Sequence, residues 1–245
     1  MNANGREYGG RSGSLFSEIS VHSRFTPPIL PMTTNPGAAV HEGTIISGSM
    51  LTFSRRIANG ISLDILKEED ADALFAVVDA NRAHLRRWLP WLDAIPSPAE
   101  KLAFILAMRK LAADNIGFSA AIRVEAEIAG VAVYRTIDSV NRSGSVGYWL
   151  AGPYQGRGLA TRACQALIDF AFAALNMNRV GIACAVENTR SRAIPQRLGF
   201  QHEGFSRDAE WLYTHYVNHA NYSLLQREWR AEILANPQRL MPPGS

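Results

Sequence analysis

The stretch from residue 147 to residue 174 constrains the fold more than any other part of the sequence. It continues an apolar strand that begins at Val146, and its second half is an amphipathic helix. Between them lies a glycine-rich turn, Gln155-Gly156-Arg157-Gly158-Leu159-Ala160. The first N–H groups of a helix have no helical partner and lie at the positive end of its dipole. Because the glycines let an anion approach and Arg157 adds a charge, the turn predicts a diphosphate site; an ordinary tight connection is the alternative.

The composition excludes several classes of protein. Of the 245 residues, 47% are hydrophobic and 19% are charged, and the formal net charge is +3. The apolar content suffices for one good-sized domain, and mild charge without a Lys/Arg tract argues against a nucleic-acid partner. No apolar run approaches a membrane span, so no membrane partner is expected. Two cysteines form no disulfide framework, which favours a cytoplasmic setting, and no His or Cys spacing predicts a metal site.

Three segments follow from the pattern along the chain. Residues 1–50 are rich in Gly, Ser, Thr, Asn and Pro and are predicted to be a disordered extension; a later translation start, at Met32 or Met50, is the alternative explanation. Residues 51–235 are predicted to form the folded domain, and residues 236–245 a flexible tail. The charged residues from Gln226 onward already indicate a tail after the last strand.

The order of elements within the domain predicts its fold class. Strands are expected at 61–66, 117–124, 128–137, 143–150, 179–186, 201–211 and 216–225, and helices from 71, at 99–113, from 158 and from 189 or 191. This order predicts a mixed α/β domain with one largely antiparallel sheet. It excludes a dinucleotide-binding fold, since the glycine turn follows the fourth strand and lacks an acidic ribose partner. Pro195 is expected in the first turn of its helix, and Gly199 is expected to end that helix with a left-handed cap.

Four stretches carry a resemblance to a known family. They are NRAHLRRWLPWL (81–92), NRSGSVGYWLAGPYQGRGLATRACQALIDFAF (141–172), AVENTRSRAIPQRLGF (185–200) and YVNHANYSLL (216–225). In order and spacing they resemble the GNAT N-acetyltransferases, most closely the RimJ/RimL-like branch, which acetylates protein N-terminal amines. The glycine turn looks like the family's Gln/Arg-x-x-Gly-x-Gly/Ala motif. The resemblance implies the GNAT acyl-CoA N-acyltransferase fold with splayed central strands, and acetyl transfer from acetyl-CoA to a primary amine.

The resemblance also implies where acetyl-CoA binds. A bulge near residues 149–151 would part the central strand from its parallel neighbour and make room for the pantetheine arm. Backbone N–H groups and Arg157 would compensate the diphosphate charge, so no metal is needed. The residues implied in binding are Trp149, Leu150, Ala151, Gln155, Gly156, Arg157, Gly158, Leu159, Ala160 and Asn188.

Two serines stand at positions that the resemblance makes catalytic. Ser191 matches the branch's hydroxyl near the sulfur and is expected to be the proton donor or sulfur partner; helix capping is its alternative role. Ser145 stands where many members have a glutamate, and a serine is too weak a base to replace it. A water relay, an already deprotonated amine, or another residue must then serve. An N-terminal amine, with a pKa of about 7.7–8.0, is partly neutral without a strong base. The other residues considered as the base are His84, Glu187, Glu210 and His215.

The acceptor side of the site is less defined. His84, Arg87 and Trp88 are expected to contact the acceptor; alternatively, Trp88 packs in a core and the arginines face water. Cys184 either points toward the acetyl group or fills the core. Asn218 stands where the branch often has Asp, which removes a charge near the closing strands.

Three functions stay open at this point. The first is a protein N-terminal acetyltransferase with a ribosomal-type acceptor. The second is a small-molecule acetyltransferase acting on a polyamine, an amino acid or an antibiotic, although the basic residues 82–87 argue against polycations. The third is an acetyl-CoA-binding module without turnover. The family also suggests a homodimer.

Overall fold

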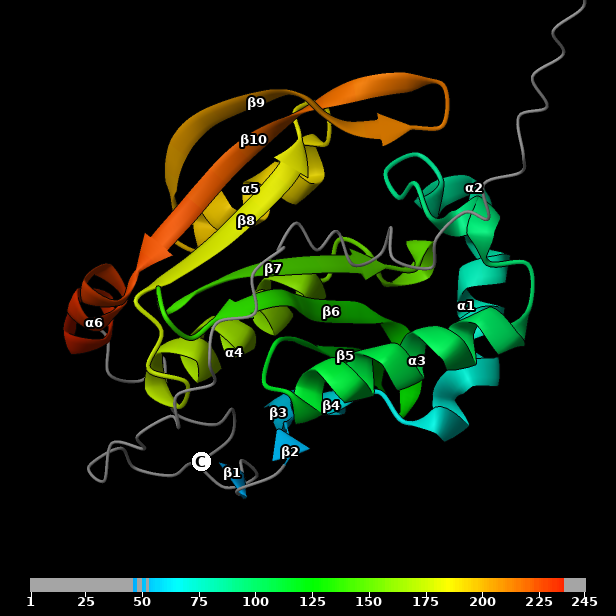
Figure 1. Cartoon of the computed structure of the whole chain (residues 1–245), viewed down its shortest axis with the longest axis horizontal. Helices are drawn as coiled ribbons and strands as arrows, with labels where there is room; N and C mark the ends of the chain where they lie inside the picture. The colour runs from blue at the N-terminus through cyan, green and yellow to red at the C-terminus, as the bar shows by residue number, and fades with distance from the viewer. Residues whose placement is uncertain (1–45, 48–49, 52, 236–245) are drawn as a thin grey trace, which may run out of the picture.

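A computed structural model describes residues 46–47, 50–51 and 53–235, in which one open eight-stranded sheet dominates (Figure 1). The strand order is β3-β4-β5-β6-β7-β8-β10-β9, and only β7 and β8 are parallel neighbours within this described sheet. The strands are β3 (Ser54–Ala58), β4 (Ile61–Ile65), β5 (Phe118–Val124), β6 (Glu127–Asp138), β7 (Ser143–Leu150), β8 (Arg179–Ala185), β9 (Gln201–Leu212) and β10 (His215–Leu225). The predicted mixed α/β fold with a largely antiparallel sheet is confirmed.

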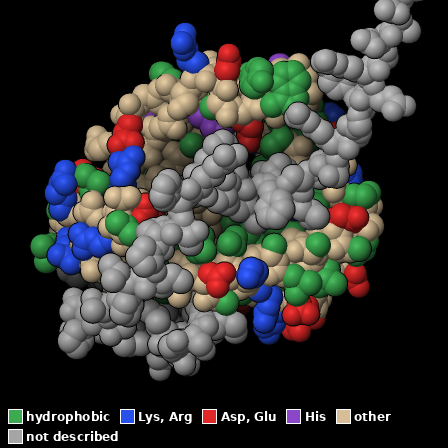
Figure 2. All heavy atoms as spheres, viewed as in Figure 1, with side chains coloured by type: hydrophobic (Ala, Val, Ile, Leu, Met, Phe, Trp, Pro, Cys, Tyr) green, Lys and Arg blue, Asp and Glu red, His purple; other side chains and the backbone are tan. Residues whose placement is uncertain are grey.

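Helices cover both faces of the sheet. The helices are α1 (Ala71–Ala80), α2 (Arg82–Leu85), α3 (Pro98–Ala113), α4 (Leu159–Ala173), α5 (Thr189–Arg197) and α6 (Gln226–Ala235), with 3-10 turns η2 (Glu68–Asp70), η3 (Leu92–Ala94) and η4 (Gly152–Tyr154). Alternation along β7 directs Val146 and Leu150 into the core shared with α4, whereas Trp149 packs toward α1 and α3. No helix in the described residues is long and apolar enough to cross a membrane. Figure 2 shows acidic and basic side chains interspersed on the face seen in Figure 1.

Local sequence signals account for several element boundaries. At the start of α3, the Ser97 hydroxyl accepts from Ala99 N–H, and the Glu100 carboxylate accepts from Ser97 N–H at 3.1 Å. This reciprocal capping, with Pro98 at the first helical position, fixes the N-terminus of the helix. The β5–β6 hairpin turns on Glu125 and Ala126, whose φ angles are 49° and 73°. Two positive φ angles in a two-residue loop match the twist of the flanking strands.

The C-terminal end of the described chain is a helix where the sequence indicated a charged tail. Residues 226–235 form α6, in which Trp229 is buried against Phe172. The indole N–H of Trp229 donates to the buried carboxylate of Asp169 at 2.8 Å. The tail prediction is therefore wrong for these residues, because Trp229 and the partly buried Ile233 dock a helix whose other residues are mostly polar. Strand β3 was also not predicted. The predictions for residues 1–45 and 236–245 lie outside the described residues.

Two further expectations are corrected by the structure. Pairing of β6 with β7 is regular from Val146 to Leu150, so there is no bulge near residues 149–151. The irregularity lies on β6 between Tyr134 and Thr136, opposite the earlier part of β7. Pro195 lies inside α5 and not in its first turn. Gly199 has the expected left-handed conformation after that helix, with φ of 78°.

Candidate active site

Strands β7 and β8 pair only over their first residues and then diverge, as Figure 1 shows. The parallel pairs are Ser143 with Arg179, Gly144 with Val180, and Ser145 with Gly181. Among the described residues, no later part of β7 pairs with β8, and we call this divergence the fork. On its β8 side, the backbone of residues 146–150 therefore offers N–H and C=O groups to an extended ligand. The predicted splay is present, without the predicted bulge.

The glycine turn, residues 155–160, follows directly from the fork. Gly156 and Gly158 have φ angles of 75° and 73°, which side chains with a Cβ adopt only with strain. A Cβ built at either glycine would have no heavy atom within 4 Å, so the backbone there is open. Gly158 is the N-cap of α4, while Leu159 and Ala160 are buried and anchor the helix. The turn thus presents an open helix N-terminus, as an anion site requires.

His84 lies against this turn. Its Nε2 atom accepts from the Gln155 side-chain amide at 2.5 Å, and the Gln155 oxygen accepts from Arg190 of α5 at 3.0 Å. Burial lowers the pKa of His84, the charges of Arg87 and Arg190 lower it further, and a hydrogen bond with the Leu150 backbone opposes the shift. His84 is therefore a neutral acceptor that orients Gln155. Its side-chain hydrogen bond is with Gln155, one of the predicted acetyl-CoA residues, and the predicted acceptor residue Arg87 lies close enough to act on its charge.

Three side chains meet on the α4 face of the fork. Ser191 Oγ lies 3.2 Å from the Tyr148 hydroxyl and 3.2 Å from Cys184 Sγ. The Asn188 side chain accepts from Ser191 N–H at 3.1 Å and caps α5. Capping is thus performed by Asn188, and the alternative role for the Ser191 hydroxyl is wrong. Cys184 is buried in the core, and its sulfur lies in this cluster.

The cluster is neutral at physiological pH. Burial raises the pKa of the Cys184 thiol, and its contacts with the Ser191 and Tyr148 hydroxyls and the charges of Arg135 and Arg192 oppose this shift. Burial also raises the pKa of the Tyr148 hydroxyl. All three groups therefore keep their protons and can act as hydrogen-bond donors. Tyr148 was missed by the sequence reasoning, although its alternation with Val146 and Leu150 along the strand could have placed it on this face.

Ser145 lies at the point where the fork opens. Its Oγ atom is 3.1 Å from Thr136 Oγ1 of β6, so its partner is another hydroxyl. Two residues further along, Gly147 is covered by Arg135: a Cβ added to Gly147 would lie 2.7 Å from Arg135 Nε. Arg135 was also missed, and an isolated strand glycine is the signal that could have found it, because such glycines often mark a close approach.

A hollow of about 500 Å³ lies beyond the end of β8, and we call it the acceptor hollow. It is lined by Arg87, Trp88, Glu187, Asp208, Leu212, His215, Tyr216, Val217 and Asn218. It brings together two predicted acceptor residues, Arg87 and Trp88, with two of the candidate bases, Glu187 and His215. Glu210, another candidate base, instead lies 3.4 Å from His219.

Asn218 has a structural role at the rim of this hollow. Its side-chain oxygen accepts from Asp208 N–H at 2.8 Å, and its carbonyl accepts from Val186 N–H at 2.9 Å. It therefore ties β9 and the end of β8 to β10. An uncharged amide performs this role without the Asp that the branch often has.

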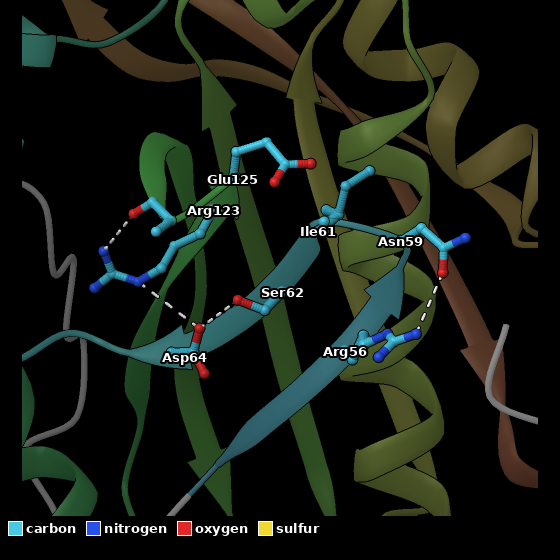
Figure 3. Close-up of a pocket in the computed structure, with 9 residues that line it drawn as sticks. Arg56, Asn59, Ile61, Ser62, Asp64, Arg123 and Glu125 are labelled. Atoms are coloured by element: carbon cyan, nitrogen blue, oxygen red, sulfur yellow. Dashed lines mark hydrogen bonds and ion pairs between the residues drawn. The ribbon is translucent and has the colours of Figure 1, made fainter. Parts of the chain in front are cut away.

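A larger hollow of about 830 Å³ lies at the other end of the sheet (Figure 3). Its polar groups pair with one another: the Asp64 carboxylate lies 3.7 Å from Arg123 and accepts from Ser62 at 2.5 Å. Arg56 donates to Asn59 at 3.3 Å. None of the predicted site residues lines it, so it does not compete with the fork as the active site. Among the described residues, no group of three His, Cys, Asp or Glu gathers to hold a metal ion.

Comparison with known proteins identifies the class of this site. The family described as Acetyltransferase (GNAT) domain matches residues 61–201. The chain is 36% identical over 184 residues to "Putative ribosomal N-acetyltransferase YdaF" of Bacillus subtilis (strain 168), a match covering 74% of this chain and 99% of that protein. It is 26% identical over 162 residues to the ribosomal-protein-serine acetyltransferase of Escherichia coli (strain K12), covering 66% and 90% of the two chains.

A solved structure supports the same family assignment. The ribosomal L7/L12 alpha-N-protein acetyltransferase RimL, in complex with coenzyme A, superposes with a TM-score of 0.69 at 26% identity, covering 71% of this chain and 98% of that one. The chain thus belongs to the GNAT acetyltransferase family and is an N-acetyltransferase. Within the family it is similar to the RimJ/RimL-like branch.

Proposed function

We propose that this enzyme transfers an acetyl group from acetyl-CoA to the α-amine at the N-terminus of a protein, by direct attack in a ternary complex. The observation that carries the proposal is the convergence of three features on one place. The open β7 edge, the glycine turn and the Ser191 cluster surround the fork, and the acceptor hollow lies past the end of β8. This arrangement serves a reaction between an extended thioester and an amine that arrives separately.

Two observations support the fit of acetyl-CoA to the fork. The unpaired edge of residues 146–150 can hydrogen-bond an amide-containing arm as a neighbouring strand would. The open glycines and the N-terminus of α4 suit a diphosphate, and the Arg157 guanidinium, which lies over the Tyr154 ring, adds a positive charge nearby. The backbone of Trp149, Leu150 and Ala151 would bind the amide-containing arm, and residues 155–160 would bind the diphosphate. The side-chain NH₂ group of Asn188 is free to donate to the arm. Acetyl-CoA supplies the activated thioester carbonyl.

The reaction requires two proton transfers, and residues of the chain assist both of them. The amine nitrogen bonds to the carbonyl carbon, the carbon–sulfur bond breaks, the nitrogen loses one proton and the sulfur gains one. We assign Ser191 as the donor for the sulfur, since its hydroxyl keeps its proton and lies in the cluster on the α4 face of the fork. Ser145 cannot take the amine proton. Glu187 and His215 line the acceptor hollow and can pass it to water, and an α-amine with a pKa of about 7.7–8.0 needs little help.

The charges of the acceptor hollow favour a single ammonium group. The Glu187 and Asp208 carboxylates can attract one amine, whereas the guanidinium of Arg87 beside them disfavours further positive charges. A polyamine carries several ammonium groups close together, so it fits this lining less well than a peptide N-terminus. Trp88 and Tyr216 offer apolar surface for the first side chains of a peptide.

Thiol release from acetyl-CoA, measured against a panel of acceptors, tests the proposal. The panel contains peptides that begin with Ser, Ala or Met, the same peptides with blocked N-termini, and spermidine. We expect release with at least one free peptide and background rates with its blocked form. Preferred use of spermidine would support the small-molecule function. Binding of acetyl-CoA without turnover for any acceptor would support a module without catalysis.

A further inference from the structure

Pro195 leaves one carbonyl of α5 without its helical partner. In an α-helix the N–H group of residue i donates to the carbonyl of residue i−4, and proline has no N–H group. The carbonyl that Pro195 cannot serve belongs to Ser191, in the first turn of α5. This is the same residue whose hydroxyl lies in the active-site cluster. A buried carbonyl without a donor is costly, so another group must serve it.

Tyr148 supplies the missing donor from a different element. Its hydroxyl donates to the Ser191 carbonyl at 2.9 Å, reaching across from β7. The single hydroxyl hydrogen of Tyr148 is then occupied, so its oxygen can only accept. The Ser191 hydroxyl lies 3.2 Å away and donates to that oxygen or to Cys184 Sγ. One phenol therefore contacts both the carbonyl and the hydroxyl of a single serine.

We propose that Tyr148 is the positioning residue for Ser191. Pro195 makes the contact possible, because it lacks the N–H group that would otherwise donate to the Ser191 carbonyl. The proposal rests on the function proposed above, in which the Ser191 hydroxyl delivers a proton at the fork. A serine side chain has three staggered rotamers, and the contact between its hydroxyl and Tyr148 favours one of them, while the bond to the Ser191 carbonyl holds the Tyr148 hydroxyl in place. With a normal residue at 195, the carbonyl would be served within the helix and Tyr148 would lose its main contact.

Another buried tyrosine provides a matched control. Tyr134 lies on the adjacent strand β6 and is fully buried, and its hydroxyl has no hydrogen-bond partner among the described residues. Tyr148→Phe and Tyr134→Phe each remove one oxygen atom from a similar strand environment. Only the first removes contacts with Ser191, so a difference between the two variants reports those contacts and not the loss of a phenol in general.

A double-mutant cycle tests the proposal. Tyr148→Phe is expected to lower Tm by about 3 °C, because the Ser191 carbonyl loses its donor. It is also expected to lower kcat by about 10-fold with KM for acetyl-CoA within about 2-fold. In Tyr148→Phe/Pro195→Ala, the restored N–H serves the carbonyl, so most of the Tm loss is recovered, whereas kcat stays low. Tyr134→Phe is expected to change neither quantity.

Three results would overturn the proposal. One is an unchanged kcat in Tyr148→Phe despite a lower Tm, which would make Tyr148 a structural residue only. Another is a double variant whose Tm stays low, which would separate Pro195 from Tyr148. The third comes from crystal structures: an unaltered Ser191 side-chain rotamer in Tyr148→Phe would contradict positioning. The Tm cycle and the rotamer need no turnover, so they stay informative if the parent enzyme acetylates none of the acceptors tested.

Discussion

At the scale of single residues, the proposed function assigns cofactor binding and proton transfer to separate groups. His84 and Gln155 contact each other at the glycine turn, whereas Ser191 lies in the protected cluster with Cys184 and Tyr148. A change in the first pair should act on acetyl-CoA affinity, and a change at Ser191 on turnover. The two groups lie on different elements, so their effects should be measurable independently.

Ser191→Ala tests the role of the hydroxyl. We expect kcat to fall by about 100-fold, since the leaving sulfur loses its proton donor, with acetyl-CoA affinity within about 2-fold. Steady-state kinetics and calorimetry measure the two quantities. Ser119→Ala is the control, because Ser119 is buried and its hydroxyl has no partner among the described residues. An unchanged kcat in Ser191→Ala would exclude a catalytic role.

The lowered pKa of His84 predicts a dependence of stability on pH. Because burial, Arg87 and Arg190 lower its folded-state pKa below 6.5, the unfolded state binds the proton more readily. The stability that His84 contributes is therefore present above about pH 6.5 and is lost as the pH falls through its folded pKa. Urea unfolding at a series of pH values from 7.5 to about 5 should show a smaller loss of stability for His84→Gln than for the parent. Equal losses would contradict the prediction.

At the scale of elements, sequence and structure agree where local chemistry decides. The strand at 143–150 and the helix after Gly158 were predicted with almost their observed bounds, because an alternating strand, two glycines and an amphipathic helix are local signals. The position of Pro195 was not predictable, because the compensating donor, Tyr148, lies in another element. The bulge was misplaced for a similar reason: the irregularity lies on β6 at Arg135, whose side chain covers Gly147 of the neighbouring strand.

Gly158 and Gly199 both have left-handed backbone conformations, but only Gly158 lies in the glycine turn. Comparing their alanine variants therefore separates the binding role of the turn from its effect on stability. Gly158→Ala should destabilise the fold by about 1 kcal/mol, because its φ is 73°, and should raise KM for acetyl-CoA by about 10-fold, because the turn must move. Gly199→Ala, at a φ of 78° after α5, should cost similar stability and leave that KM unchanged. An equal effect of both variants on KM would show that the turn is only a connection.

At the scale of the whole molecule, α6 closes the core of the domain. Trp229 is 6% exposed and Leu234, on the same helix, is 83% exposed. The sequence marks this helix only weakly, since Trp229 with its bond to Asp169 and the partly buried Ile233 one turn later dock it. The sequence therefore predicted most of the sheet and its longer helices, but contacts between distant elements decided α6, the cluster around Ser191 and the composition of the acceptor hollow.

Trp229→Ala tests this closing role. Loss of the buried indole should destabilise the protein by about 3 kcal/mol, while kcat at 25 °C should change little because α6 lies away from the fork. Leu234→Ala should stay within about 0.5 kcal/mol of the parent. Thermal unfolding measures both. A drop in kcat of the folded Trp229→Ala enzyme would show that α6 contributes to the site.

The position of the transferred acetyl group on a peptide shows directly whether the enzyme acetylates the N-terminal α-amine. A peptide with a free N-terminal serine and one internal lysine is incubated with the enzyme and acetyl-CoA, and tandem mass spectrometry locates the label. We expect one acetyl group on the α-amine, none on the lysine, and no product from the same peptide with a blocked N-terminus. Acetylation of the lysine, or no acetylation of any free N-terminus in the panel, would contradict it.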